Sequence, residues 1–574
     1  MNATLKYKFS DFSVFATGII TLIICFVFAW KNKEGKFVNY IDGDSRFYYE
    51  YLHSTFIKTT SLNISHSGNS VITHHPVGLS LLLLPFFLLA FAYASLFNYP
   101  LDGLSEPFQI SICLGAVFYV LVGLVYLKKL FQLNNVSDKI SALVIALIFF
   151  GTNLYHYTII ASAMSHAYSF CFITLFLYHG CKFVTQNQNR NLIYAAIIFG
   201  IILLLRPNNG LVIFSLLFWF KSKEEFVEFF KKLFKNKTFY IALLIPVLLV
   251  IFQLLVWQAK EHSFFSNRYA PYGFSWLKPH FIKMLFGFNA GFFVYTPLCF
   301  LFLFGLISLY KQNKFLFYST TIFLLGLFYF LSAYSAYTYF DGLGIRVLVD
   351  YYSVFALLGA KLFMNLESEK LLFIGILTIA LFFSAMSLLY SYQSKKDILL
   401  QSGMTRKQWQ YIFLKTDKSY QNCLGGSNDL IPYSKEEAKL LLEKTLPLEI
   451  PFDYSKKDFG IVIPFDSIGF TSNRVLIKVN VKRSETFANA SKDAMICIAL
   501  EDKQKQNKGY AQFKLNETPS TDCCAEREYF YQYAMFGNFQ PDDRMLIYVW
   551  NINKEAFSIN KFSTQVYNYN YQIN

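Results

Sequence analysis

Long apolar runs separated by short polar loops fill about the first 390 residues of the chain. The first run, residues 12–30, is about 19 residues long, which is enough for a helix to cross a bilayer. No small-residue cleavage site follows it, so we interpret it as a membrane span or signal anchor. The later runs bring the prediction to about 11 spans: 109–127, 140–158, 167–183, 192–205, 211–220, 239–257, 292–310, 315–333, 347–364 and 371–390.

One pair of runs, 192–205 and 211–220, is short and separated by a break that begins with Arg206 and Pro207. The pair forms either two short spans or one interrupted helix. Breaks at membrane depth usually line a cavity, because their free backbone groups need polar partners.

The segment 77–97, with Pro85 inside it, decides the topology. If it does not cross, the lysine-rich loop 221–238 and the basic N-terminus lie on one side, as the positive-inside rule requires. We therefore predict that it lies along or dips into the outer interface. The N-terminus is then cytoplasmic and the C-terminal part extracytoplasmic, in what we expect to be a bacterial plasma membrane.

After about residue 391 the pattern changes to a polar stretch, expected to be helical to about Lys444, and then to short alternating runs. Such runs between polar breaks predict the strands of a β-sandwich or jelly roll. They are 460–465, 474–481, 494–500, 510–515 and 545–550. The predicted architecture is a polytopic α-helical membrane domain (1–390), a helical or linker segment (391–450) and a β-rich extracytoplasmic domain (451–574).

Composition supports this class, because 54% of the residues are hydrophobic and only 16% are charged, against roughly 25% charged in soluble domains. A disordered chain, a collagen and a small disulfide scaffold are excluded. The net charge of +15 lies mostly in loops between apolar runs, so it indicates membrane orientation and not nucleic-acid binding. The cysteines have no zinc-binding spacing, and Cys423, Cys497, Cys523 and Cys524 in the tail leave a disulfide open.

Two carboxylates, Asp42 and Asp44, follow the first span on the predicted outer face. A carboxylate there can act as a general base that deprotonates an acceptor hydroxyl or amine as it attacks a sugar C1 atom. Asp-Gly-Asp is also common in solvated turns. The motif alone leaves both interpretations open.

Two adjacent histidines, His74 and His75, precede the segment 77–97. At an interface they could bind a lipid-linked phosphate or a metal ion, although such a pair is often structural or only exposed. No third metal ligand is identifiable, so we predict no metal site and no certain cofactor, and a divalent metal stays open.

Three arginines stand at the predicted outer ends of spans: Arg206, Arg268 and Arg346. Guanidinium groups bind phosphate oxygens well, and ionisable groups near a membrane are costly enough to indicate function. Each alone is also explained as an interfacial anchor with a snorkelling side chain. Three on one face favour an anionic substrate. No Walker loop, GxSxG, HExxH or Rossmann fingerprint is found in the sequence.

Short polar segments also interrupt the apolar runs in a recognisable order. They are Asp42-Gly43-Asp44 with Tyr48, His75-Pro76-Val77-Gly78, Gly151-Thr152-Asn153-Leu154-Tyr155 with Met164-Ser165-His166, Leu205-Arg206-Pro207-Asn208-Asn209, Gly291-Phe292-Phe293-Val294-Tyr295-Thr296-Pro297 and Gly344-Ile345-Arg346-Val347-Leu348-Val349-Asp350. In this order the chain resembles the membrane-embedded GT-C glycosyltransferases, in the bacterial branch of the protein mannosyltransferases and the lipid A aminoarabinose transferase. The resemblance covers roughly residues 1–390.

The resemblance implies a polyprenyl-phosphate-linked sugar donor and an inverting transfer on the outer face. The family's catalytic aspartate stands four residues before a Tyr, which implies Asp44 relative to Tyr48, with Asp42 as a supporting or alternative base. The family often has Lys-Pro-Pro where this chain has His74-His75-Pro76. The positive charge of that lysine would then come from Arg206, Arg268 or Arg346.

The sequence thus predicts a hexosyl- or pentosyltransferase that moves a sugar from the lipid-linked donor to a glycan, lipid or protein acceptor. Its expected partners are this donor, the membrane lipid and the acceptor, with no nucleic acid. A flippase or transporter of lipid-linked sugars, and a polysaccharide polymerase or ligase, remain as alternatives. The tail either positions an acceptor or binds glycan, or is a passive structural cap.

Overall fold

The structure, a computed structural model, describes residues 8–29, 39–41, 44–57, 75–264, 273–339, 342–426, 439–446, 452–453, 459–465, 474–485, 493–518, 526–536, 540 and 542–568. The chain divides into two compact units. The first comprises Met1–Arg268, Phe292–Leu331 and Leu343–Ser391, and the second comprises Tyr269–Gly291, Ser332–Gly342 and Tyr392–Asn574.

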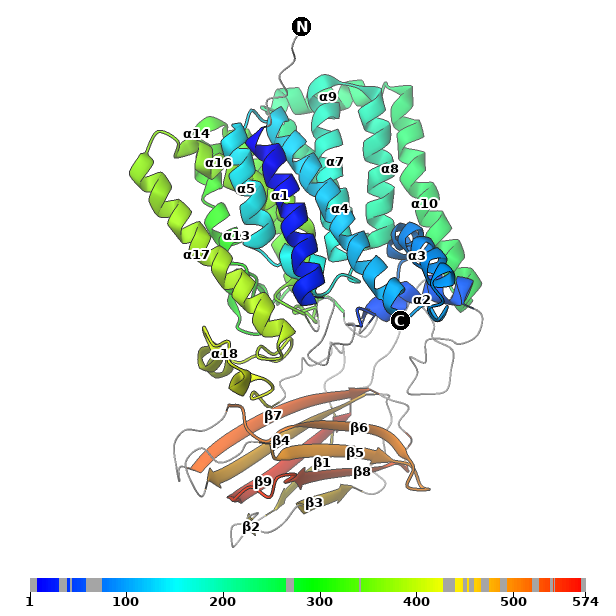
Figure 1. Ribbon diagram of the computed structural model, residues 1–574, viewed down its shortest axis with the longest axis vertical. Helices are drawn as coiled ribbons and strands as arrows, with labels where there is room; N and C mark the ends of the chain where they lie inside the picture. Colours follow the sequence, from blue (N-terminus) through cyan, green and yellow to red (C-terminus); the bar gives the residue numbers. More distant parts are fainter. Residues whose placement is uncertain are drawn as a thin grey trace. The chain divides into compact units, whose positions relative to one another are not determined.

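The first unit is a bundle of helices, several of which run alongside one another (Figure 1). Its elements are α1 (Phe9–Ile24) with the π-helical turn η1 (Cys25–Ala29), α2 (Asp44–Phe56), α3 (Gly78–Leu96), α4 (Glu106–Leu133), α5 (Asp138–Phe150), α6 (Leu154–Ile159), α7 (His166–Gln186), α8 (Asn189–Leu205), the 3₁₀ helix η2 (Pro207–Trp219), α9 (Lys223–Leu233), α10 (Lys237–Glu261), α12 (Phe292–Tyr295), α13 (Pro297–Phe302), α14 (Gly305–Gln312), α15 (Lys314–Ala333), the 3₁₀ helix η3 (Arg346–Tyr351), α16 (Tyr352–Asn365) and α17 (Lys370–Lys395). Helix α7 packs between α4 and α8, and α8 packs against α10.

Among the described residues, eight helical segments are long and apolar enough to cross a membrane. The chain is therefore a polytopic helical membrane protein, as the sequence predicts. Several predicted spans are shorter or broken. The run 140–158 breaks after α5, the run 211–220 lies in η2, and the run 292–310 is divided among α12, α13 and α14. Proline explains two of these breaks, because Pro207 and Pro297 have no N–H to continue the preceding helix.

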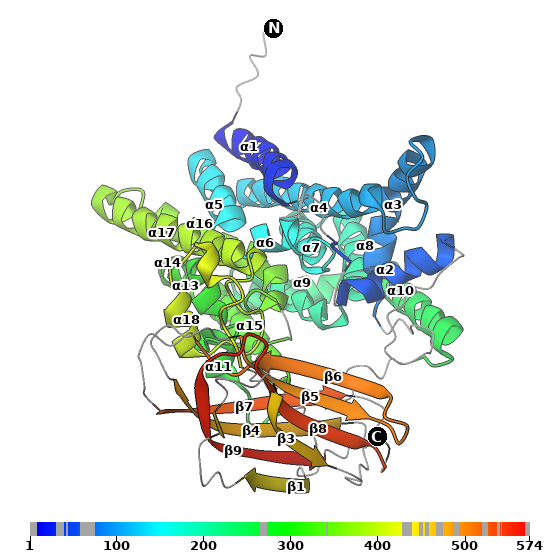
Figure 2. The same ribbon diagram turned by 60° about the horizontal axis from the view of Figure 1, so that its bottom comes forward.

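Helix α3, which includes the segment that decides the predicted topology, runs across the direction of α7 and α8 (Figures 1 and 2). Its first turn meets the end of α8 so closely that a Cβ atom on Gly78 would lie 2.4 Å from the carbonyl oxygen of Leu204. A helix that lies along the membrane interface is expected to run in this direction, across the helices that span the membrane. By length and composition alone α3 could also span, so its interfacial position stays a prediction.

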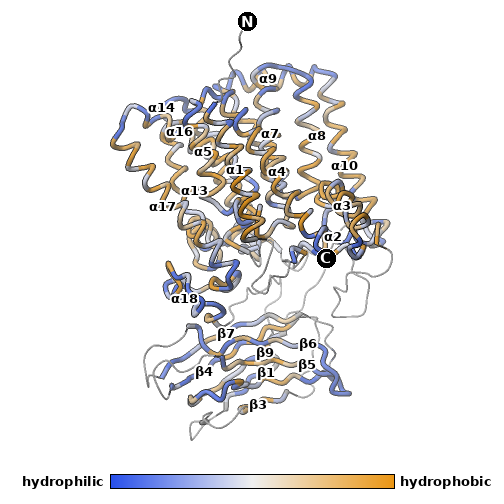
Figure 3. The backbone as a smooth tube through the Cα atoms, in the orientation of Figure 1, coloured by the Kyte–Doolittle hydropathy of each residue, from blue (hydrophilic) through white to orange (hydrophobic). Residues whose placement is uncertain are grey.

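One end of the bundle gathers the loops predicted to be cytoplasmic. Polar contacts join these loops. Near the start of α1, Asp11 contacts Lys128 of α4 and Ser10 contacts Asp138 of α5. Ser137 in the α4–α5 turn contacts Glu367 in the α16–α17 turn, and Asn313 before α15 donates to the carbonyl oxygen of Lys221 before α9. Hydrophilic residues are concentrated at this end, around α9 (Figure 3). This grouping agrees with the predicted orientation.

The second unit contains two antiparallel β-sheets. One sheet has the strand order β1-β9-β4-β7, with β2 also paired to β9, and the other has the order β3-β8-β5-β6. The strands are β1 (Lys439–Leu446), β2 (Phe452–Asp453), β3 (Phe459–Phe465), β4 (Arg474–Glu485), β5 (Met495–Glu501), β6 (Asn507–Lys514), β7 (Glu526–Phe536), β8 (Arg544–Trp550) and β9 (Phe557–Asn568). Alternate residues of both sheets form one buried hydrophobic core, as in a sandwich.

The five runs predicted to be strands coincide with β3, β4, β5, β6 and β8. The helical expectation for the stretch up to about Lys444 is largely wrong. Its described part contains the end of α17, the short helix α18 (Arg406–Ile412) and a 3₁₀ turn (Lys418–Tyr420), and then begins strand β1. Strand β1 contains leucine, lysine and glutamate, which favour helices, but its pairing with β9 overrides that preference.

The strand β4 carries a charge in the interior of the second unit. The side chain of Arg483 is fully buried, and its Nε lies 2.9 Å from Oε1 of Glu485. The Nη2 atom lies 3.4 Å from Oε2 of Glu555, and the guanidinium carbon lies 3.8 Å from the ring centroid of Phe557. A buried charge requires this degree of pairing.

The topology can be tested with a reporter inserted at residue 230 in α9. We expect it on the same side of the membrane as a reporter fused before α1, because only then do the basic loops share one side. Accessibility of single cysteines to an impermeant thiol reagent in intact cells would measure this. Exposure of residue 230 to the outside, with the N-terminus inside, would mean that α3 spans the membrane.

Candidate functional site

The carboxylate of Asp44 and the guanidinium of Arg346 form an ion pair, with 2.5 Å between Oδ2 and Nη2. Asp44 is the first residue of α2, where a negative charge is favoured by the helix dipole. Arg346 is the first residue of η3. The side chain of Asp44 is 26% exposed and that of Arg346 only 10%. The carboxylate can therefore be reached from outside the protein, while the arginine is largely enclosed.

The segment before Arg346 is held in place by two buried side chains. Nδ2 of Asn153 and the hydroxyl of Tyr157 both donate to the carbonyl oxygen of Leu343, at 2.7 and 3.3 Å. Gly344 follows with a φ of +67°, in the left-handed region that glycine adopts without steric cost. A Cβ atom there would lie 2.6 Å from Nδ2 of Asn153. Glycine at this position thus lets the chain turn tightly into η3.

Arg206 lies in the break between α8 and η2. The residue before a proline is disfavoured in the helical region, and Arg206, which precedes Pro207, is extended, with φ of −156° and ψ of 105°. Nη1 of Arg206 donates to the hydroxyl of Ser165 at 3.2 Å. Its Nε lies 3.4 Å from Oδ2 of Asp350. The helix break therefore brings this guanidinium to η3.

Asp350 is completely buried, and groups from three segments surround its carboxylate. Nδ1 of His166 lies 2.8 Å from Oδ1, at hydrogen-bonding distance, and this ring nitrogen is the donor when Asp350 is ionised. Nδ2 of Asn209 donates to Oδ2 at 2.7 Å. Arg206 and Arg346 both lie within electrostatic range of Asp350. The two predicted phosphate-binding arginines thus belong to one cluster.

His75 is described, and it lies among aromatic side chains. Its ring stacks on Phe47 with 5.1 Å between centroids and meets Tyr48 edge-on at 4.5 Å. The hydroxyl of Tyr51 donates to the carbonyl oxygen of His75 at 2.8 Å. With only 1% of its surface exposed, His75 positions α2 against the start of α3. Its predicted contact with phosphate stays a prediction.

Three of the predicted site residues, Asp42, His74 and Arg268, lie outside the described residues. Those that are described divide into two groups. Asp44, Arg206 and Arg346 belong to one cluster, and His75 belongs to the aromatic packing around α2.

Sequence reasoning did not select Asp350, His166 or Asn209 for the site, although each lies in a segment that carries the family resemblance. One signal was available. Asp350 interrupts an apolar run, and an ionisable residue inside a membrane span needs a partner and often marks function. Its partners could not be identified, because they lie far away in the sequence.

Within the part of the chain that the structure describes, no group of three or more His, Cys, Asp or Glu side chains is arranged to hold a metal ion. The cluster instead offers guanidinium groups for an anion and, at Asp44, an accessible carboxylate. Two arginines can stabilise a phosphate, and a carboxylate can accept a proton. This combination suits the transfer of a group away from a phosphate.

Comparison with known proteins gives structural likenesses only. No sequence-family description matches the chain, and no curated protein matches it either. The oligosaccharyltransferase AglB of Archaeoglobus fulgidus, in complex with an inhibitory peptide and a dolichol-phosphate, has a TM-score of 0.37 and 12% identity over 75% of this chain and 62% of its own. The arabinosyltransferase EmbB of Mycobacterium smegmatis has a TM-score of 0.37 and 8% identity over 98% of this chain and 64% of its own.

This chain therefore spans somewhat less than two thirds of the length of both proteins.

The structural role of Asp350 can be tested by Asp350→Asn. We expect a loss of stability of about 3–5 kcal/mol, because the change leaves Arg206 without its buried counter-charge. Thermal unfolding of the full chain in detergent measures the effect. Asp11→Asn is the control, since Asp11 is 45% exposed in its ion pair with Lys128 and such pairs contribute about 0–1 kcal/mol. Equal losses in the two variants would show that Asp350 does not organise the cluster.

Proposed function

We propose that the chain is a glycosyltransferase that uses a polyprenyl-phosphate-linked sugar and transfers the sugar to an extracytoplasmic acceptor with inversion. The observation that carries this proposal is the ion pair between Asp44 and Arg346. It joins the carboxylate suited to act as base to an arginine suited to bind phosphate. Such a pairing is expected where a bond between a sugar and a phosphate is broken next to a nucleophile that must lose a proton.

In the proposed step the acceptor oxygen or nitrogen forms a bond to C1 of the sugar, and the bond from C1 to the phosphate oxygen breaks. The leaving polyprenyl phosphate keeps the electron pair. Asp44 takes the proton from the acceptor as general base. Arg206 and Arg346 stabilise the negative charge that develops on the phosphate. Attack from the face opposite the leaving group inverts the configuration at C1.

Binding of the donor requires a change in the pairing of Arg346. With both aspartates ionised, Asp44 and Asp350 balance the charges of Arg206 and Arg346 within these two described ion pairs. A donor phosphate therefore competes with Asp44 for the Arg346 guanidinium. When the phosphate replaces the carboxylate, Oδ2 of Asp44 becomes free to accept a proton. Donor binding would in this way activate the base.

The burial of the two carboxylates supports this division of roles. Asp350 is completely buried and has His166 and Asn209 as further partners, so it can hold Arg206 permanently. Asp44 is partly exposed at a helix start and can reach a bound acceptor. A transporter of lipid-linked sugars would need the arginines but would not need a carboxylate that is freed by the phosphate.

The role of Asp44 is tested by Asp44→Asn in a transfer assay with a panel of polyprenyl-phosphate sugars. We expect kcat to fall by about 10²–10⁴-fold, the usual contribution of a general base. Glu106→Gln is the matched control, because Glu106 is an exposed carboxylate in the first turn of α4, and its activity should be unchanged. Full transfer by Asp44→Asn would disprove the assignment. Movement of the lipid across vesicles by the native chain, with no transfer to any acceptor, would favour the transporter.

The role of Arg346 is tested by Arg346→Lys. Lysine keeps the charge but loses the planar fork that fits a phosphate. We therefore expect the KM for the donor to rise more than kcat falls, the reverse of the pattern for Asp44→Asn. Steady-state kinetics with varied donor concentration separates the two effects. An unchanged donor KM would exclude Arg346 as a phosphate ligand.

A further inference from the structure

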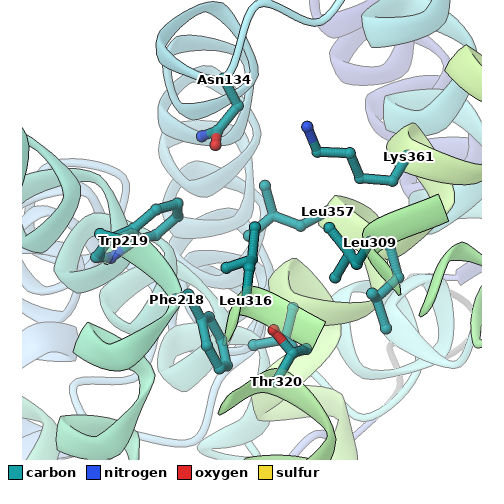
Figure 4. Close-up of a pocket in the computed structure, with 10 residues that line it drawn as sticks. Asn134, Phe218, Trp219, Leu309, Leu316, Thr320, Leu357 and Lys361 are labelled. Atoms are coloured by element: carbon teal, nitrogen blue, oxygen red, sulfur yellow. The ribbon is translucent and has the colours of Figure 1, made fainter. Parts of the chain in front are cut away.

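A pocket that is partly open to solvent lies among η2, α14, α15 and α16 in the first unit (Figure 4), and its roughly 380 Å³ of empty space includes open solvent. Most of its lining is apolar, including Phe218, Leu316 and Leu357. Lys361 and Asn134 add polar groups, and no part of the proposed transfer reaction uses them.

The ammonium group of Lys361 has no hydrogen bond or ion pair within the part of the chain that the structure describes. In Figure 4 its nitrogen is directed toward the carboxamide of Asn134 across the cavity. Lys361 is only partly exposed, and a cation among apolar side chains is costly without a counter-ion. The described residues that line the cavity thus provide no anion for this cation.

Trp219 provides a second unpaired donor on the same lining. The side chain is only 8% exposed, and its Nε1 is buried with no hydrogen-bond partner among the described groups. Buried donors of this kind are rare, because an unmade hydrogen bond costs free energy. This nitrogen lies beside Gly180 of α7, because a Cβ atom on that glycine would be 3.9 Å from it. The need for an anion in the cavity therefore rests on Lys361.

The position of the cavity indicates the kind of anion. Lys361 follows Arg346 by 15 residues along the helical run of η3 and α16, which corresponds to about 23 Å at 1.5 Å per residue. Asn134 is the C-terminal cap of α4 and stands beside the loops that gather at the predicted cytoplasmic end. The cavity is thus separated from Asp44 by most of a bilayer thickness. An anion near the predicted cytoplasmic end of the bundle, next to an apolar lining, would be a lipid head group.

We propose that this cavity binds a membrane phospholipid with a negatively charged head group. Its phosphate oxygens accept hydrogen bonds from Lys361 and from the Asn134 carboxamide, and an acyl chain lies against Phe218 and Leu316. The charge of the phosphate complements the ammonium group, which an uncharged apolar occupant would leave unpaired. This inference does not depend on the proposed transferase activity, and the two can fail separately.

The test uses the purified full chain in a neutral detergent, with thermal unfolding measured as phosphatidylglycerol is added. A ligand that binds the folded state raises Tm, and the stabilisation grows with the logarithm of ligand concentration over Kd. We expect the native chain to be stabilised, and Lys361→Met to need about tenfold more lipid for the same shift, equivalent to about 1.4 kcal/mol. Lys361→Arg should keep most of the response.

Lys370→Met is the matched control, because Lys370 is an exposed lysine at the start of α17 near the same end. It should respond to phosphatidylglycerol like the native chain. Without lipid, Lys361→Met should be at least as stable as the native chain, since it removes an unpaired cation. That measurement shows whether the variant is folded.

Other probes distinguish the possible sources of phosphate. Phosphatidylcholine, polyprenyl phosphate and inorganic phosphate are added in parallel to the native chain and to Lys361→Met. A Lys361-dependent shift that is strongest with phosphatidylglycerol supports the proposal. A stronger Lys361-dependent shift with polyprenyl phosphate or inorganic phosphate would overturn the assigned occupant. An equal response of Lys361→Met and the native chain to phosphatidylglycerol would overturn the site.

Discussion

The pairing of a completely buried carboxylate controls the geometry of the candidate site. Asp350 would be too costly in a membrane protein interior without donors on its oxygens. These donors come from the start of α7, from the break after α8 and from η2, so these segments have to meet at η3. The same constraint fixes where the Arg206 guanidinium lies. The position of Arg206 thus follows from the need to neutralise one buried charge.

The two arginine–carboxylate pairs differ in a way that matters for chemistry. In one pair the carboxylate of Asp350 is inaccessible and has two further partners, so the pair is structural. In the other pair the carboxylate of Asp44 is partly exposed and lies at a helix start. Replacing Asp44 as the partner of Arg346 therefore costs a ligand much less free energy than replacing Asp350 as the partner of Arg206. The cluster therefore combines one ion pair that stays in place with one that a ligand can open.

The sequence was informative where a short-range pattern determines the structure. Apolar runs predicted most of the long helices, and alternation predicted five strands of the second unit. Polar residues near span ends drew attention to Asp44, Arg206 and Arg346, which the structure places in one cluster. It was uninformative where partners are distant. Arg346 and Asp44 are separated by 302 positions, and no local pattern connects them. Strand β1 was missed because its pairing with β9, and not its own composition, makes it extended.

The distribution of charge along η3 and α16 is the last consequence of these constraints. Arg346, at one end of this run, has the carboxylate of Asp44 at 2.5 Å. Lys361, near the other end, has no such partner among the described residues. If both charges were structural anchors, both would be expected to be paired within the protein or fully solvated. The half-buried and unpaired state of Lys361 fits neither case, and an external anion supplies what the chain does not.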